Sequence, residues 1–152
     1  MYTAGRRVEK KIALAGLLTT LALAAGTAFL ARAQAGASTR DGVYTESQAN
    51  RGQASYKSAC ASCHGEALEG SGAATPPLVG DDFTMNWAGQ TLDDLFEKIQ
   101  TSMPADHPGK LSRAENADIL AYILKINKLP AGKNDLPSDT GDLKQIRFEA
   151  AR

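Results

Sequence analysis

Two cysteines and a histidine stand close together in the first half of the chain, and these residue types can bind metals and cofactors. They form the run Cys60-Ala61-Ser62-Cys63-His64. Two thiols three residues apart can add across the two vinyl groups at one edge of a haem, and an imidazole directly after them can reach the iron from one face. The spacing therefore predicts one covalently attached c-type haem held by Cys60, Cys63 and His64.

The same two cysteines allow other interpretations, which the rest of the sequence does not favour. In an exported protein two cysteines by default form a disulfide, but a pair this close that runs straight into a histidine is not typical of a framework disulfide. A thioredoxin-like dithiol needs a βαβ context, and a zinc site needs a second Cys or His pair at ligand spacing. The sequence contains neither feature.

The second axial ligand of the iron has three candidates, because Met103, Met85 and His107 all follow the attachment motif. We expect Met103 to be the ligand, since a proline-rich loop can return its thioether to the face opposite His64. The alternative for a methionine is burial in a core, but no apolar periodicity surrounds Met103. We expect His107 to be a solvated loop histidine, with iron ligation as its less favoured alternative, and Met85 to pack beside Trp87.

The first 33 residues are typical of a secretory signal peptide. Basic side chains precede an apolar run over residues 12–30, and small residues follow that suit cleavage after Ala33 or Ala35. The alternative is an uncleaved membrane anchor, because the apolar run is almost long enough to span a bilayer. Either form leaves the remaining domain outside the cytoplasm, and we expect a periplasmic location.

The charge of the chain argues against nucleic-acid binding. The whole chain has 17 basic and 17 acidic residues, and loss of residues 1–33 removes five basic residues and one acidic residue, which leaves a net charge of −4. Proteins that bind nucleic acids usually carry a basic stripe along the phosphate track, and no such cluster is present.

Three helices are predicted to position these groups. Capping residues and apolar periodicity place them at residues 45–59, 91–101 and 113–128. Residues 65–89 are rich in glycine and proline and are predicted to form a long loop, which inside a compact domain indicates a segment wrapped around a cofactor. No strand pattern is strong enough to name, so the sequence predicts an all-α fold.

The predicted domain boundaries follow from these elements. After the signal peptide we expect a short linker at 34–41, then one folded domain at 42–130. Residues 131–152 are polar and are predicted to form a surface tail, docked through Ile146 and Phe148.

Four different motifs are spread along the chain: Gly52-x-x-x-Tyr56-x-x-x-Cys60-x-x-Cys63-His64, Pro76-x-Leu78-x-Gly80, Met103-Pro104, and the helix that carries Ile119 and Tyr122. Together they resemble the monohaem class I cytochromes c over roughly residues 42–130. The resemblance implies an all-α fold of three main helices with long loops around one covalent haem c.

The resemblance also implies roles for individual residues. The carbonyl of Pro76 would accept the proton on the far ring nitrogen of His64 and so fix its tautomer. Met103 would be the distal iron ligand. Gly52 and Tyr56 would lie on the face of the first helix that crosses the last helix, where a glycine permits a close approach.

Other stretches, at residues 78–83, 87, 103–112 and 117–124, resemble a bacterial subgroup of these cytochromes. Its members are often fused to, or work beside, dehydrogenases that depend on pyrroloquinoline quinone (PQQ). The resemblance therefore implies redox protein partners, with a PQQ-dependent dehydrogenase as a source of electrons and a terminal oxidase as a further partner.

The sequence thus predicts a one-electron carrier and not an enzyme, since no substrate needs to reach an iron whose axial positions are both occupied. An apolar wall of Leu78, Leu95, Ile99 and Tyr122 is expected to disfavour the extra charge of the oxidised iron. Two alternatives stay open at this point. One is a haem enzyme or gas-binding protein with a labile sixth ligand, and the other is a fixed cytochrome subunit of a dehydrogenase complex.

Overall fold

Helices dominate residues 37–152, the part of the chain that the computed structural model describes. In chain order the elements are β1 (Ala37–Ser38), the 3-10 helix η1 (Thr39–Asp41), α2 (Glu46–Ala59), α3 (Ala61–His64), α4 (Asp81–Trp87), α5 (Leu92–Ser102), α6 (Arg113–Ile126), α7 (Thr140–Leu143) and β2 (Ile146–Arg147). The all-α fold is confirmed, and α2, α5 and α6 lie where the sequence predicts three helices. The predicted signal peptide lies outside the described residues. Within them, no helix combines the length and apolarity that crossing a membrane requires.

Side-chain caps explain where the long helices begin. The Thr91 hydroxyl caps α5 and the Ser112 hydroxyl caps α6, and each helix has a reciprocal capping box. At α2 only half of a capping box forms: the Thr45 hydroxyl accepts from the backbone N–H of Gln48. The Gln48 amide instead bonds both backbone groups of Leu136, which lies far along the chain.

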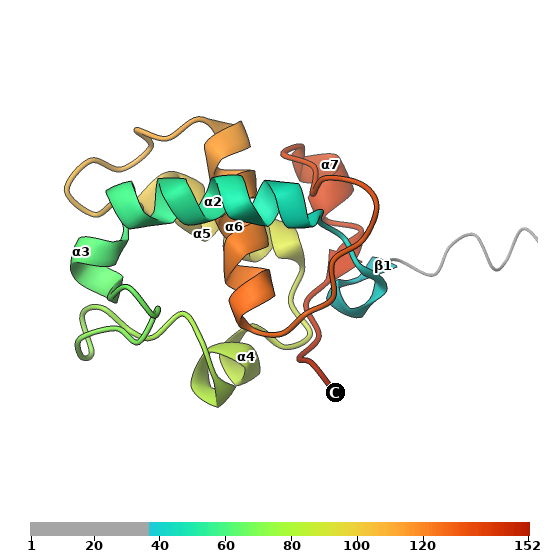
Figure 1. Cartoon of the computed structure of the whole chain (residues 1–152), viewed down its shortest axis with the longest axis horizontal. Helices are drawn as coiled ribbons and strands as arrows, with labels where there is room; N and C mark the ends of the chain where they lie inside the picture. Colours follow the sequence, from blue (N-terminus) through green and yellow to red (C-terminus); the bar gives the residue numbers. More distant parts are fainter. Residues whose placement is uncertain (1–36) are drawn as a thin grey trace, which may run out of the picture. The chain divides into compact units, whose positions relative to one another are not determined.

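The crossing of α2 over α6 forms the centre of the domain (Figure 1). A Cβ atom on Gly52 would lie only 1.8 Å from the carbonyl oxygen of Asp118 in α6, so only glycine allows this approach. One turn further along α2, the ring of Tyr56 packs at 5.5 Å from the ring of Tyr122. The helix contact expected from the resemblance is therefore present.

Helix α4 corrects the prediction that residues 65–89 are loop throughout. This helix has seven residues, and its N-cap, Gly80, offers no side chain to satisfy the free backbone groups. Phe83 and Trp87 stand four residues apart on one face, with tilted rings 6.5 Å apart. A helix this short has little stability of its own, so tertiary contacts decide whether it forms.

The two ends of the described chain pair with each other, and residues 37–41 of the predicted linker take part in this pairing. Strands β1 and β2 form a short parallel pair, a feature the sequence pattern does not show. Thr39 in η1 is buried, and its hydroxyl donates to the carbonyl of Glu149 at 2.8 Å and accepts from the backbone N–H of that residue. This part of the segment is therefore integrated into the fold.

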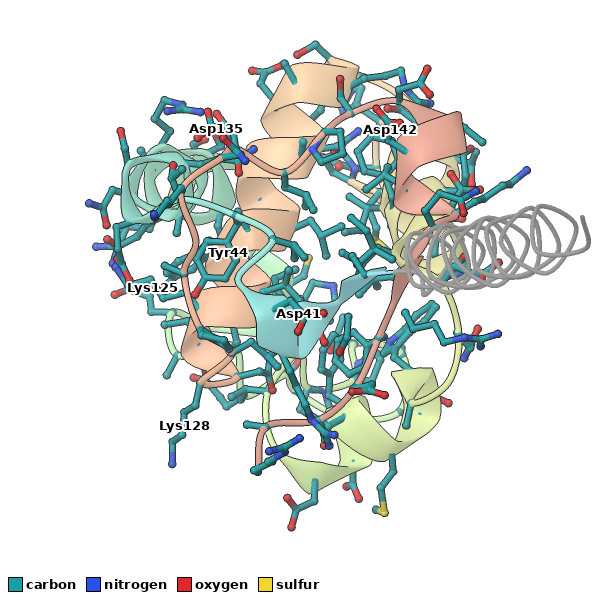
Figure 2. The ribbon with its side chains drawn as sticks, turned by 90° about the vertical axis from the view of Figure 1, so that its right-hand side faces the viewer. Asp41, Tyr44, Lys125, Lys128, Asp135 and Asp142 are labelled. Atoms are coloured by element: carbon teal, nitrogen blue, oxygen red, sulfur yellow. The ribbon has the colours of Figure 1, made fainter. Side chains whose placement is uncertain are left out.

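Residues 131–152, predicted to form a surface tail, contribute several buried side chains to the core. Ile146 and Phe148 are buried, as predicted for docking residues, and Leu136 and Leu143 are buried with them. Tyr44 lies inside the domain near these segments, whereas Lys128 extends outward (Figure 2). The Tyr44 hydroxyl donates to the carbonyl of Leu129 at 2.7 Å.

Candidate functional site

A cavity of about 1040 Å³ opens between α3, α4, α5, α6 and the loop that follows α5. Its volume lies just above the usual range for cofactor pockets, about 300–1,000 Å³. Most of its wall is apolar, with the following large side chains: Leu78, Phe83, Trp87, Leu95, Ile99, Leu111, Ile119 and Ile123. The acidic and lysine side chains among the lining residues are all exposed. The cavity is therefore suited to a large, mainly apolar group.

All five residues that the sequence singled out as cofactor-binding line this one cavity: Cys60, Cys63, His64, Pro76 and Met103. They come from three separate regions of the chain. The fold thus brings the attachment motif, the proline of the long loop and the methionine after α5 around one space.

The end of α2 positions the two cysteines. Cys60 is the C-cap of α2 and at the same time the N-cap of α3, so the chain turns sharply within the motif. The Tyr56 hydroxyl donates to the carbonyl of Gly65 at 2.7 Å, and this bond ties α2 to the residue directly after His64. Gly65 itself has a φ of +79°, a value that favours glycine.

Both cysteines of the chain lie in the described part and carry free thiols. Burial raises the pKa of the Cys60 thiol to about 11, and the neighbouring Cys63 acts in the same direction. Cysteines that act as nucleophiles or in disulfide exchange have lowered pKa values, because the thiolate is the reactive form. This environment therefore does not favour a dithiol enzyme.

His64 is buried, with 8% of its surface exposed, and its ring is held in one tautomer. Its Nδ1 lies 3.1 Å from the carbonyl oxygen of Pro76. Since a carbonyl can only accept, Nδ1 must carry the proton, and Nε2 is left with a lone pair for a metal. The contact that the resemblance implies between Pro76 and His64 is present.

The loop after His64 doubles back to bring Pro76 to the histidine ring. The backbone N–H of Gly70 donates to the carbonyl of His64, and that of Leu78 donates to the carbonyl of Leu68. Gly70 has a φ of +69°, and a Cβ there would lie 2.5 Å from the carbonyl oxygen of Thr75. Backbone geometry therefore sets the distance between Pro76 and His64.

The three candidates for a second iron ligand differ in their surroundings. Met103 is partly buried and lines the cavity directly after α5. His107 also lines it, but its side chain is 67% exposed and pairs with Asp106 at 3.1 Å, as expected for a solvated loop histidine. Met85 is 68% exposed, so the prediction that it packs beside Trp87 is wrong. Helix α4 turns Met85 away from the face that carries Phe83 and Trp87.

The predicted apolar wall is correct for Leu78, Leu95 and Ile99, but Tyr122 is not among the lining residues. Its ring packs against Tyr56 at the helix crossing instead. Ile119 and Ile123, four residues apart on α6, take its place. The prediction also missed the wall that α4 supplies. The apolar pair Phe83 and Trp87, directly after two acidic residues, is the signal that could have indicated it.

Within residues 37–152, no group of three or more His, Cys, Asp or Glu side chains is arranged to hold a metal ion. A family model described as cytochrome C oxidase, cbb3-type, subunit III matches residues 47–123. The match covers α2, α3, α4, α5 and most of α6. Comparisons with curated proteins and with solved structures gave no significant match.

Proposed function

We propose which residues of this chain bind its haem, where in the cell the protein acts and which partners it has. The chain belongs to the family described as cytochrome C oxidase, cbb3-type, subunit III. The domain is a c-type cytochrome domain that carries electrons on one covalently bound haem. We assign covalent attachment of this haem to Cys60 and Cys63, and His64 and Met103 would bind its iron.

The observation that carries this assignment is the convergence of these four side chains on one cavity. The cavity has the volume and the apolar walls for a large group, and its lining includes two free thiols at the attachment spacing. The bond from His64 Nδ1 to Pro76 leaves Nε2 as the nitrogen that can bind iron. The residues present therefore fit one covalent haem.

The bound haem supplies a centre that gains and loses one electron, and the residues of this chain set how readily that happens. The Pro76 carbonyl orients the His64 ring and raises its basicity. As an iron ligand, the thioether of Met103 would favour the reduced state more than a second imidazole. The apolar walls from α4, α5 and α6 exclude water and disfavour the additional positive charge of the oxidised state.

For the location and the partners we propose the periplasm and two redox proteins. The signal-like residues 1–33 support export. The stretches that resemble cytochromes of PQQ-dependent dehydrogenases support such a dehydrogenase as the donor. The description of the family as an oxidase subunit supports a terminal oxidase as the acceptor.

The same family description favours a second candidate role, that of a fixed subunit in a larger complex. Size-exclusion chromatography of the detergent-extracted holoprotein distinguishes the two. A free carrier elutes as a monomer, whereas a fixed subunit elutes together with other polypeptides.

The axial assignment is tested by three variants of the exported holoprotein. We expect Met103→Ala to leave the iron open to carbon monoxide in the reduced state, because the variant lacks the thioether. Met85→Leu and His107→Ala serve as controls and should keep the absorption spectrum of the parent. Carbon monoxide binding by the parent, or loss of the parent spectrum in His107→Ala alone, would overturn the assignment of Met103.

The attachment itself is tested by mass spectrometry of denatured protein. We expect the parent mass to include one haem and the Cys60→Ala/Cys63→Ala variant to lose it under denaturing conditions. A parent protein that denatures to the bare polypeptide mass contradicts the thioether bonds.

A further inference from the structure

Helix α4 (Asp81–Trp87) forms one wall of the cavity but has little helical stability of its own. Phe83 and Trp87 line the cavity. The helix has only seven residues and no side-chain cap at its N-terminus, and such a short helix is marginal in isolation. Contacts from other parts of the chain must therefore fix its position.

Asn127, directly after α6, holds the N-terminal end of α4. Its Oδ1 accepts from the backbone N–H of Gly80, the N-cap of α4, at 3.1 Å. Its Nδ2 donates to the carbonyl of Leu78 at 2.9 Å and to that of Ile123 at 2.9 Å. The side chain is buried and uses both ends of its amide, so it fixes the segment before α4 to the end of α6.

Phe148, near the C-terminus, contacts α4 through its ring and the segment just after α4 through its backbone. Its ring is fully buried and meets the ring of Phe83 edge-on, with centroids 5.9 Å apart and an angle of 83°. Its backbone N–H donates to the carbonyl of Gln90, and its carbonyl accepts from the N–H of Gly89. The segment just after α4 is thus paired with the C-terminal segment through backbone bonds.

The segment that carries Phe148 is in turn bonded to residues at the start of the described chain. Strand β2 pairs with β1, and the side chain of Thr39 bonds both backbone groups of Glu149. Arg40 adds a bond to the carbonyl of Ala150 at 2.7 Å. Residues 37–41 and 146–150 are therefore bonded to each other, and both ranges lie outside the residues that the family model matches.

We propose that Asn127 and Phe148 are positioning residues that hold α4 against the haem and so keep water out of the cavity. The proposal rests on the proposed function, because it requires the haem to lie in this cavity. Water near an iron stabilises its more highly charged oxidised state, so exclusion of water favours the reduced state. Terminal segments that touch no iron ligand would thus contribute to setting the reduction potential.

The test compares Phe148→Ala and Asn127→Ala with Leu136→Ala in the exported holoprotein. Leu136 is a matched control, since it is buried in the same C-terminal region but its backbone bonds lead to Gln48 on α2. One readout is the reduction potential. The other is the fluorescence of Trp87, the single tryptophan of the chain, which a nearby haem quenches.

At an ambient potential that leaves the parent half reduced, we expect Phe148→Ala and Asn127→Ala, the two α4 variants that loosen this helix, to show a severalfold higher ratio of oxidised to reduced haem. We also expect the fluorescence of Trp87 to rise, because a loosened α4 moves away from the haem. Leu136→Ala should be less stable than the parent but keep its potential and its quenched fluorescence. Equal shifts in all three variants, or parent values in both α4 variants, would overturn the proposal.

Two further measurements keep the outcome decisive. If Phe148→Ala does not give folded protein, Phe148→Leu replaces it. The reduction potential of Phe148→Leu must then be lower than that of the parent. The denatured mass of each variant shows separately whether haem is attached. Protein that lacks haem contradicts the proposed function, whereas haem protein with an unchanged potential contradicts only the role of α4.

Discussion

Replacing Gly52 by alanine tests the helix crossing that carries the attachment motif. In an exposed helix position, alanine is more favourable than glycine by roughly 0.5–1 kcal/mol, because glycine loses more backbone entropy on folding. Helix propensity alone therefore predicts a more stable variant. The structure predicts the opposite sign, because α6 occupies the space that the new methyl group needs.

The size of the effect follows from the contact distances. The added Cβ would lie 1.8 Å from the carbonyl oxygen and 2.4 Å from the carbonyl carbon of Asp118. Both are backbone atoms inside α6, so no flexible side chain can move aside. Overpacking in a core typically costs about 1–3 kcal/mol, and a clash between two helix backbones belongs at the upper end or beyond. We expect a loss of about 3 kcal/mol, which for a domain of this size lowers the thermal midpoint by roughly 10–15 °C.

The assay is thermal unfolding of the holoprotein, followed by circular dichroism. Ala54→Gly, an exposed position on the same helix, is the control and should lower stability by about 1 kcal/mol through helix propensity alone. A Gly52→Ala variant with an unchanged or raised thermal midpoint would show that α2 and α6 do not approach as closely as described.

Two tyrosine hydroxyls give the remaining predictions. Tyr56→Phe should destabilise the protein by about 1 kcal/mol, because it leaves the Gly65 carbonyl without its donor, and an unchanged thermal midpoint would contradict this. Burial raises the pKa of Tyr44 to about 12, so the unfolded chain loses this proton first as the pH rises. The stabilisation is complete below about pH 10 and is lost between pH 10 and 12, an effect of roughly 2–3 kcal/mol. Denaturant unfolding should therefore show a steeper loss over this range for the parent than for Tyr44→Phe, and parallel profiles would refute the assignment.

The haem motif and the three long helices could be predicted because their signals are local. Attachment to adjacent vinyl groups requires two thiols at short spacing with a histidine next to them, so Cys60, Cys63 and His64 can be proposed as the attachment residues without a structure. Helix starts are similarly local, since a capping side chain such as Ser112 bonds to backbone groups only three residues away.

Side-chain direction at the site was less predictable. Met103, Met85 and His107 all follow the motif, and the sequence could only rank them. The structure turns Met85 into solvent and leaves Met103 on the cavity wall. Tyr122 shows the same limit: its helix was predicted, but packing against Tyr56 moved its ring out of the wall.

By itself, then, the sequence indicated the proposed attachment motif and determined the helices whose caps and apolar stripes lie within a few residues. The tertiary structure decided the long-range parts: the half-formed capping box at Gln48, the short helix α4, and the pairing of the two ends of the described chain. The physical reason is that each of these depends on a partner tens of residues away. A donor, ring or strand edge has no visible partner in the local sequence until the fold brings that partner beside it.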